Sequence, residues 1–241
     1  MQLPTKYSTG CKSLDALLGG GFESGTVTQL YGEAGSGKTN ICLQMAVECA
    51  RKGDSVVIID SEGISTERFT QIATAHATDD KEVERLAGRI ILYQPQNFEQ
   101  QTSAVKELDT IIKEKAGKSR VSLVILDSAT LFYRLELDDD RSMYLRRVLA
   151  NQIMQLLEIA RQYDLVVIIT NQVYTDVENG RLRPSGGSAL EHLSKVIVQL
   201  ERVEGGQGKR KATLKKHRSM PEDTSCAFYI TSTGIEDSPP R

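Results

Sequence analysis

The chain has 241 residues, of which 39% are hydrophobic, and its formal net charge is -2. This composition allows one substantial core, while the near-balanced charge excludes wholesale polyanion binding, so that any nucleic-acid surface must be a local patch. No apolar run approaches the roughly 20 residues that span a bilayer, and the N-terminus lacks the apolar core of a secretory signal. We therefore expect a cytoplasmic protein with one domain over residues 1–236 and a disordered tail over residues 237–241.

Short β-rich apolar runs alternate with amphipathic stretches along the chain. Strands are predicted at Val27–Tyr31, Ser55–Asp60, Arg89–Pro95, Val121–Asp127 and Leu165–Asn171. Helices are predicted at Asn40–Arg51, Glu67–Ala77, Phe98–Ala116 and Met143–Tyr163.

Near-continuous Val, Ile and Leu runs are typical of parallel strands that are buried on both faces. Near the C-terminus, Lys195–Val203 and Lys209–His217 flank the stretch EGGQG, which predicts a hairpin. The predicted fold class is therefore α/β, with a largely parallel twisted sheet flanked by helices and a C-terminal antiparallel hairpin.

A glycine-rich phosphate loop is predicted between the first strand and the first helix, because Gly32, four residues and then Gly37-Lys38-Thr39 have its spacing. Glycines let successive N–H groups point inward, and the helix N-terminus adds partial positive charge. Lys38 is expected to reach the β- and γ-phosphates of a bound nucleotide, and the Thr39 hydroxyl to ligate Mg²⁺. The alternative is a chance glycine turn. The full expected nucleotide-contacting set in this stretch is Gly32, Glu33, Ala34, Gly35, Ser36, Gly37, Lys38, Thr39 and Asn40.

Polar residues end the other predicted strands, where ligands bind in open sheets of this class. Asp127 follows a buried run and is expected to hold the Mg²⁺ shell, although acids also end buried strands for structural reasons. Glu62 is the candidate for orienting or activating water, and its alternative is a solvated turn residue. Asp60 is structural or a competing candidate. Gln172 either senses the γ-phosphate or satisfies backbone groups in a turn.

Four stretches carry a family resemblance, namely STGCKSLDALLGGGFESGTVTQLYGEAGSGKTNICLQMAV, VVIIDSEGISTERF, VILDSATLFYR and VVIITNQVYTDVENG. In this order they resemble the RecA-type recombinases, and closely the archaeal RadA and eukaryotic strand-exchange branch. The resemblance runs from about Ser8 to Gly234 and implies a RecA-type P-loop ATPase core. It also implies that Glu62 is the catalytic glutamate and Gln172 the phosphate sensor, acting with Lys38. Arg68 matches the arginine that lies against adenine, or is a surface helix residue.

The departures from that branch narrow the resemblance. We expect no N-terminal helix-hairpin-helix domain and no Phe-x-x-Ala docking segment, and KKHRSMPE stands where the Asp/Pro cap over ATP would be. This combination resembles the short archaeal paralogues of the branch, which are associated with DNA repair and homologous recombination. The implied partners are DNA, the RadA recombinase and the Holliday-junction resolvase, and self-association stays open.

Two loops would face DNA in this family. The first, Arg134–Ser142, contains four acids that repel a phosphate backbone: Glu136, Asp138, Asp139 and Asp140. The second, Val173–Ser188, offers Arg181 and Arg183 for backbone contact, or is an ordinary surface loop.

A basic stretch near the C-terminus has three interpretations. In the first interpretation its first four cations form a solvated face, and in the second they form a DNA-backbone patch: Lys209, Arg210, Lys211 and Lys215. The third interpretation makes Lys216 and Arg218 fingers that reach the γ-phosphate of an adjacent subunit.

The functional expectation is an ATP-binding, slowly hydrolysing paralogue that binds DNA and modulates repair and homologous recombination through partner proteins. The alternative is an ATPase switch or adaptor that acts on protein partners without binding DNA directly.

Overall fold

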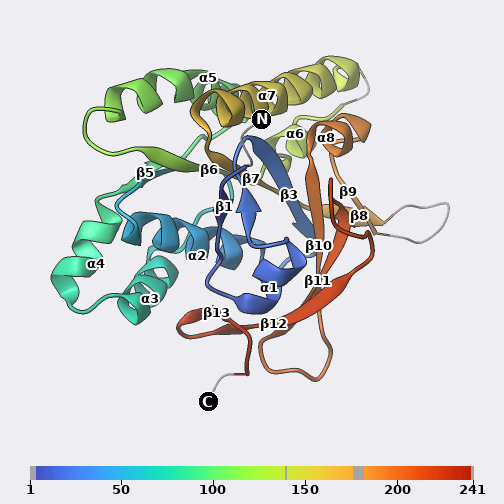
Figure 1. Cartoon of the computed structure of the whole chain (residues 1–241). Helices are drawn as coiled ribbons and strands as arrows, with labels where there is room; N and C mark the ends of the chain where they lie inside the picture. The colour runs from blue at the N-terminus through green and yellow to red at the C-terminus, as the bar shows by residue number, and fades with distance from the viewer. Residues whose placement is uncertain (1–3, 139, 176–181, 240–241) are drawn as a thin grey trace.

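A twisted nine-stranded sheet runs through the centre of the computed structural model, which describes residues 4–138, 140–175 and 182–239 (Figure 1). The strand order is β13-β12-β11-β10-β3-β7-β6-β4-β5. The strands are β3 (Thr26–Gly32), β4 (Ser55–Asp60), β5 (Ile90–Tyr93), β6 (Val121–Asp127), β7 (Val166–Asn171), β10 (Val196–Arg202), β11 (Lys209–Lys216), β12 (Ser225–Thr231) and β13 (Gly234–Glu236). Two short pairs lie outside it, β1 (Lys6–Tyr7) with β2 (Phe22–Glu23) and β8 (Val173–Thr175) with β9 (Leu182–Pro184).

Helices cover both faces of the sheet. They are α1 (Lys12–Leu17), α2 (Lys38–Arg51), α3 (Thr66–His76), α4 (Asp80–Ala87), α5 (Phe98–Lys115), α6 (Leu131–Leu135), α7 (Ser142–Tyr163) and α8 (Ser188–Leu193). Figure 1 shows α5 and α7 together on one side and α1 to α4 on the other. Among the described residues, no helix has the length and apolarity that crossing a bilayer requires.

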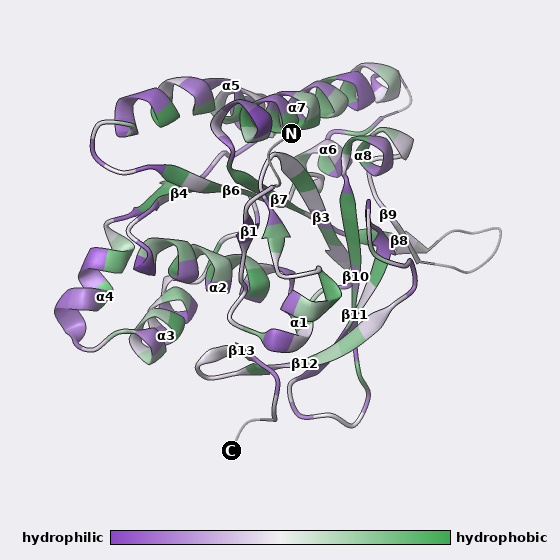
Figure 2. Ribbon diagram, in the orientation of Figure 1, coloured by the Kyte–Doolittle hydropathy of each residue, from purple (hydrophilic) through white to green (hydrophobic). Residues whose placement is uncertain are grey.

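The strands are apolar on both sides because each side meets a helix layer. Val56 and Ile58 pack into the core beneath α2, whereas Val57 and Ile59, which point the other way, pack against α5 and α7. In Figure 2 the central strands are accordingly green along much of their length, while purple residues lie along the outer surfaces of the helices. This two-sided burial is what the Val/Ile/Leu runs predict for a parallel sheet.

All the pairs from β10 through β3, β7, β6 and β4 to β5 are parallel. The remaining pairs, from β10 to β13, are antiparallel. The predicted α/β class is confirmed, and the antiparallel part extends the predicted hairpin by β12 and β13. The carboxyl ends of β3, β4, β6 and β7 therefore meet at one edge, as the sequence predicted.

Most predicted elements form within one or two residues of their expected ends, and β4 and β6 have the predicted bounds. No predicted element covers α4, whose N-cap Asp79 accepts the backbone N–H of Glu82 at 2.8 Å. Only Leu86 of this helix is buried, with Val83 packed beside it, so its apolar stripe is short.

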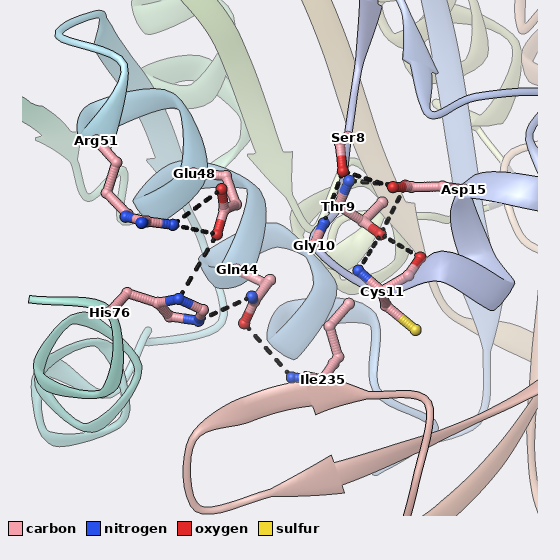
Figure 3. A network of polar contacts seen from close by, with 10 residues as sticks. All are labelled: Ser8, Thr9, Gly10, Cys11, Asp15, Gln44, Glu48, Arg51, His76 and Ile235. Atoms are coloured by element: carbon pink, nitrogen blue, oxygen red, sulfur yellow. Dashed lines mark hydrogen bonds and ion pairs between the residues drawn. The ribbon is translucent and has the colours of Figure 1, made fainter.

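A polar network ties α2 to its surroundings (Figure 3). Gln44 lies 3.1 Å from the Nε2 atom of His76 on α3, and its Oε1 atom accepts the backbone N–H of Ile235 on β13 at 3.4 Å. Glu48, one turn further along α2, accepts from Arg51 at 3.1 Å and lies 3.7 Å from the Nδ1 atom of His76. The helix that begins at the phosphate loop is thus anchored to both α3 and the last strand.

The C-terminal segment caps the first helix. Asp237, the first residue of the expected tail, accepts the backbone N–H groups of Lys12 at 2.9 Å and Ser13 at 2.7 Å. The N-cap residue Cys11 provides no side-chain bond of its own to these groups. Burial alone would raise the pKa of Asp237, but the bonds from Ser13 and Lys12 outweigh it and lower the pKa. The charged carboxylate is therefore the capping form at neutral pH.

Asp237→Ala should lower the free energy of unfolding by about 1 kcal/mol, the usual value of an N-cap. The thermal midpoint should fall by roughly 2–4 °C for a chain of this size. Because the folded-state pKa is depressed, the difference from wild type is present at neutral pH and disappears as the pH falls through the aspartate range. Melting curves at several pH values measure this, with Ser238→Ala as the neighbouring control. Equal midpoints for the two variants at neutral pH would contradict the capping role.

Candidate nucleotide site

The phosphate loop joins the end of β3 to the start of α2, and its glycines are sterically required. A Cβ atom at Gly32 would lie 2.2 Å from the carbonyl oxygen of Leu200. Gly35 and Gly37 have φ angles of +73° and +106°, which L side chains rarely adopt. The buried Ser36 hydroxyl has no hydrogen-bond partner among the described residues. The predicted loop thus forms a tight cradle that carries one unsatisfied polar group.

Lys38 lies inside this loop with only 6% of its surface exposed. Its Nζ atom donates to the carbonyl oxygens of Gly32 at 2.9 Å and Glu33 at 3.0 Å. Burial lowers the pKa of Lys38, whereas the carboxylates of Glu62 and Asp127 act to raise it. The geometry brings the predicted ammonium group to the centre of the cradle.

Thr39 and Asp127 form the second part of the site. The Thr39 Oγ1 atom donates to Asp127 Oδ2 at 2.8 Å, and Thr170 on β7 donates to the other carboxylate oxygen. Burial raises the pKa of Asp127 to about 6, against the lowering effect of these two bonds. Among the described residues, no three His, Cys, Asp or Glu side chains gather as a metal site. The Thr39 hydroxyl and the Asp127 carboxylate are oxygen ligands of the kind that Mg²⁺ binds, with its other ligands coming from phosphates and water.

Glu62, Gln172 and Arg134 form a chain of hydrogen bonds across three strand ends. Gln172, directly after β7, donates its Nε2 atom to Glu62 Oε1 at 2.7 Å. Arg134, in α6 beyond β6, donates to Gln172 Oε1 at 2.5 Å. The two residues predicted to act at the γ-phosphate are thus in direct contact.

Asp60 has a different position. Its carboxylate accepts the backbone N–H groups of Gly63 at 2.8 Å and Ile64 at 2.7 Å, and that of Glu62 at 3.2 Å. With 2% of its surface exposed, it shapes the turn that presents Glu62. The geometry favours the structural alternative for Asp60.

Arg68 lies beside the first turn of α2. Its Nε atom donates to Asn40 Oδ1 at 2.8 Å, and its Nη2 atom donates to the carbonyl oxygen of Thr231 at 2.8 Å. Arg68 and Asn40, both predicted to contact nucleotide, therefore lie between the phosphate loop and the β12–β13 turn.

The basic residues do not form one patch. Arg210 donates to the carbonyl oxygen of Gly35 in the phosphate loop at 2.9 Å. Lys211 lies 3.9 Å from Glu201, and Lys215 pairs with Asp223. Lys209 begins β11 and is half-buried.

The two finger candidates and the cations of the second loop also have different surroundings. Lys216 donates to the backbone carbonyl of Glu191 in its own chain at 2.6 Å, and Arg218 is exposed. Arg183 lies in β9 opposite Tyr174 of β8, whereas Arg181 lies outside the described residues.

Three contacts of the site were not predicted: those of Thr170, Arg134 and Arg210. Thr170 is a polar residue inside a buried apolar strand, a signal that could have been used. The partners of the two arginines depend on how distant segments meet, for which the local sequence carries no signal.

Comparison with known proteins supports the same architecture. The family model described as Rad51 matches residues 4–238. The chain is 53% identical to the DNA repair and recombination protein RadB of Methanococcoides burtonii, over 94% of this chain and 96% of that protein. It is 47% identical to the RadB protein of Archaeoglobus fulgidus, over 95% and 96% of the two chains.

A solved structure agrees as well. A crystal structure of the RadB recombinase aligns with a TM-score of 0.81 and 35% identity, over 96% of this chain and 99% of that chain. The resemblance inferred from the sequence is therefore confirmed, and the family implies a RecA-like ATPase fold that binds nucleotide. The chain belongs to the Rad51 family of RecA-type recombinases and, within it, to the archaeal RadB branch.

Proposed function

We propose that this chain binds ATP with Mg²⁺, hydrolyses the ATP slowly, and uses the nucleotide state to adjust its contacts with DNA and partner proteins in DNA repair and homologous recombination. One observation carries the proposal: the Glu62–Gln172–Arg134 chain lies at the same sheet edge as Lys38 and the Thr39–Asp127 pair. The RadB relatives, which are named DNA repair and recombination proteins, support the biological setting.

The residues present fit the nucleotide and its metal. A Cβ atom at Gly32 would clash with the Leu200 carbonyl, and the left-handed φ angles of Gly35 and Gly37 disfavour side chains there. The Ser36 hydroxyl, which has no partner among the described residues, and the Lys38 ammonium both face this loop. Thr39 and Asp127 would hold Mg²⁺, which when bound offsets charge on the β- and γ-phosphate oxygens. Arg68 and Asn40 would lie toward the adenine end, beside the first turn of α2.

Glu62 is the residue for orienting and activating water. Its carboxylate is exposed, and the Gln172 amide occupies one acceptor site on Oε1, so Oε2 can still accept a proton from water. Lys216, a finger in the third interpretation of the basic stretch, is bonded within its own chain. A cation that stabilises charge developing on the γ-phosphate is worth several kcal/mol, and without one we expect slow hydrolysis.

The hydrogen-bond chain also provides a route from nucleotide to surface. Gln172 precedes β8, which begins the second loop, and Arg134 begins the first loop. A γ-phosphate that competes for the Gln172 amide would alter the bond to Glu62 and, through Arg134, bias both loops. The RadA recombinase, the Holliday-junction resolvase and DNA are the partners that we propose for these surfaces.

A second candidate function is a nucleotide switch that acts on protein partners without direct DNA contact. The first loop and the start of α7 favour it, because large apolar side chains are exposed there: Leu135 is 73% exposed, Met143 83% and Tyr144 62%. Exposed Asp138 and Asp140 accompany them. Apolar groups among acids suit a protein surface better than a phosphate backbone.

Lys38→Ala and Glu62→Gln should separate binding from hydrolysis. Loss of the Lys38 ammonium should abolish detectable ATP binding, because it is the buried cation of the loop. Glu62→Gln should bind ATP normally and hydrolyse it about 10²-fold more slowly, the lower range for a general base. Calorimetry and phosphate release measure the two effects, with Glu67→Gln on α3 as the control. Unchanged hydrolysis by Glu62→Gln would exclude Glu62 as the catalytic carboxylate.

Gln172→Ala should bind ATP within about twofold of wild type but lose the effect of nucleotide on DNA or partner affinity, because it removes the link between Glu62 and Arg134. The measurement compares binding of single-stranded DNA and of RadA with ADP and with a nonhydrolysable ATP analogue. Gln162→Ala, at the end of α7 and away from the site, is the control. A nucleotide effect that survives in Gln172→Ala would rule out this route.

Direct DNA binding should depend steeply on salt, because bound cations release counterions from the strand. Replacing both Lys209 and Lys211 with Gln should reduce the slope of log K against log salt by about 1.4 for single-stranded DNA, since each phosphate contact contributes about 0.7. Replacing exposed Lys81 and Lys118 in the same way should leave the slope unchanged. Absence of salt-dependent binding by wild type would favour the switch that acts without DNA.

A further inference from the structure

The strand β11 presents its basic side chains to two different sides of the sheet. Ala212 and Leu214 are fully buried in the core beneath α1 and α2, and Arg210 shares their face because side chains alternate along a strand. Lys209 and Lys211 point to the opposite side, where Lys211 lies 3.9 Å from Glu201. The basic run of the sequence is therefore divided between the nucleotide side and the far side.

The phosphate loop lies directly against this part of the sheet. A Cβ atom at Gly37 would lie 3.2 Å from Ile230 and 3.5 Å from Phe228 of β12. Phe228 is the register partner of Arg210, so the guanidinium reaches the loop from the same surface. Its Nε–H bond to the Gly35 carbonyl is 2.9 Å long.

We propose that Arg210 is a positioning residue of the nucleotide site, which holds the phosphate loop from its outer side, and that it is not part of a DNA surface. This inference rests on the proposed ATP binding. In a trans peptide the C=O and N–H groups point in opposite directions. Holding the Gly35 carbonyl therefore also orients the Ser36 N–H, which closes the turn onto the Glu33 carbonyl at 3.2 Å.

The charges around Arg210 agree with this role. Arg202 is its register partner on β10, and like charges directly opposite each other destabilise a sheet. Both arginines line a cavity of about 670 Å³ together with Glu33 of the loop. They bring positive charge beside a loop that must receive a polyanion, and the acids Glu33 and Glu204 also line this cavity.

The test compares two substitutions on the same strand that remove the same charge from opposite faces. Arg210→Gln should weaken MgADP binding roughly tenfold, the effect of losing one hydrogen bond to a charged group. Lys211→Gln should stay within about twofold of wild type, because it lies on the other face. Calorimetry with MgADP measures both affinities.

Two further readouts separate positioning from a general loss of structure. The nucleotide-free thermal midpoint of Arg210→Gln should match that of Lys211→Gln, while its rise with MgADP should be smaller. Its salt slope for single-stranded DNA should equal that of wild type. A slope lowered by about 0.7 with unchanged MgADP affinity would overturn the proposal and make Arg210 a DNA contact.

A conservative variant covers the case in which Arg210→Gln fails to fold. Arg210→Lys keeps the charge but lacks the Nε–H donor, so MgADP should still bind about threefold more weakly. Affinity equal to wild type would overturn the positioning role. Failure of wild type itself to bind MgADP would instead refute the proposed function, and this inference with it.

Discussion

The bond between Thr39 and Asp127 connects the two halves of the candidate site. Thr39 opens α2 after the phosphate loop, and Asp127 ends β6, two strands away from β3 in the sheet. A buried carboxylate is costly unless its oxygens are hydrogen-bonded, and Thr39 and Thr170 each satisfy one of them. The position of the loop relative to the other strand ends is therefore set by a pair of groups that also suit a divalent cation.

Parallel pairing of the strands places the site residues together at one edge of the sheet. The strands β3, β7, β6 and β4 are neighbours, so residues that are far apart in sequence end up at one edge. The contact between Gln172 and Glu62 spans 110 residues of sequence. The site therefore depends on the sheet topology, because no single loop supplies all of its residues.

Much of this could be predicted from the sequence because the signals are local. The spacing from Gly32 to Thr39 and the apolar runs of β4 and β6 depend only on neighbouring residues. Other features depend on register and packing between distant segments. In the sequence, Arg210 cannot be told apart from the other cations of the basic stretch. In the structure, strand alternation and its bond to Gly35 place it on the face of the phosphate loop. Helix α4 is mostly polar and has only a short apolar stripe at Val83 and Leu86, and the cap provided by Asp237 depends on contact between segments that are far apart in sequence.

The anchoring of α2 has a mechanical consequence. Gln44 joins this helix to α3 and β13, and β13 packs so closely that a Cβ atom at Gly234 would lie 2.1 Å from the Gln44 side chain. Close packing of this kind resists sliding of one element past another. We therefore expect this helix to stay fixed when nucleotide is exchanged, with displacement confined to side chains at the strand ends and the segments that follow them.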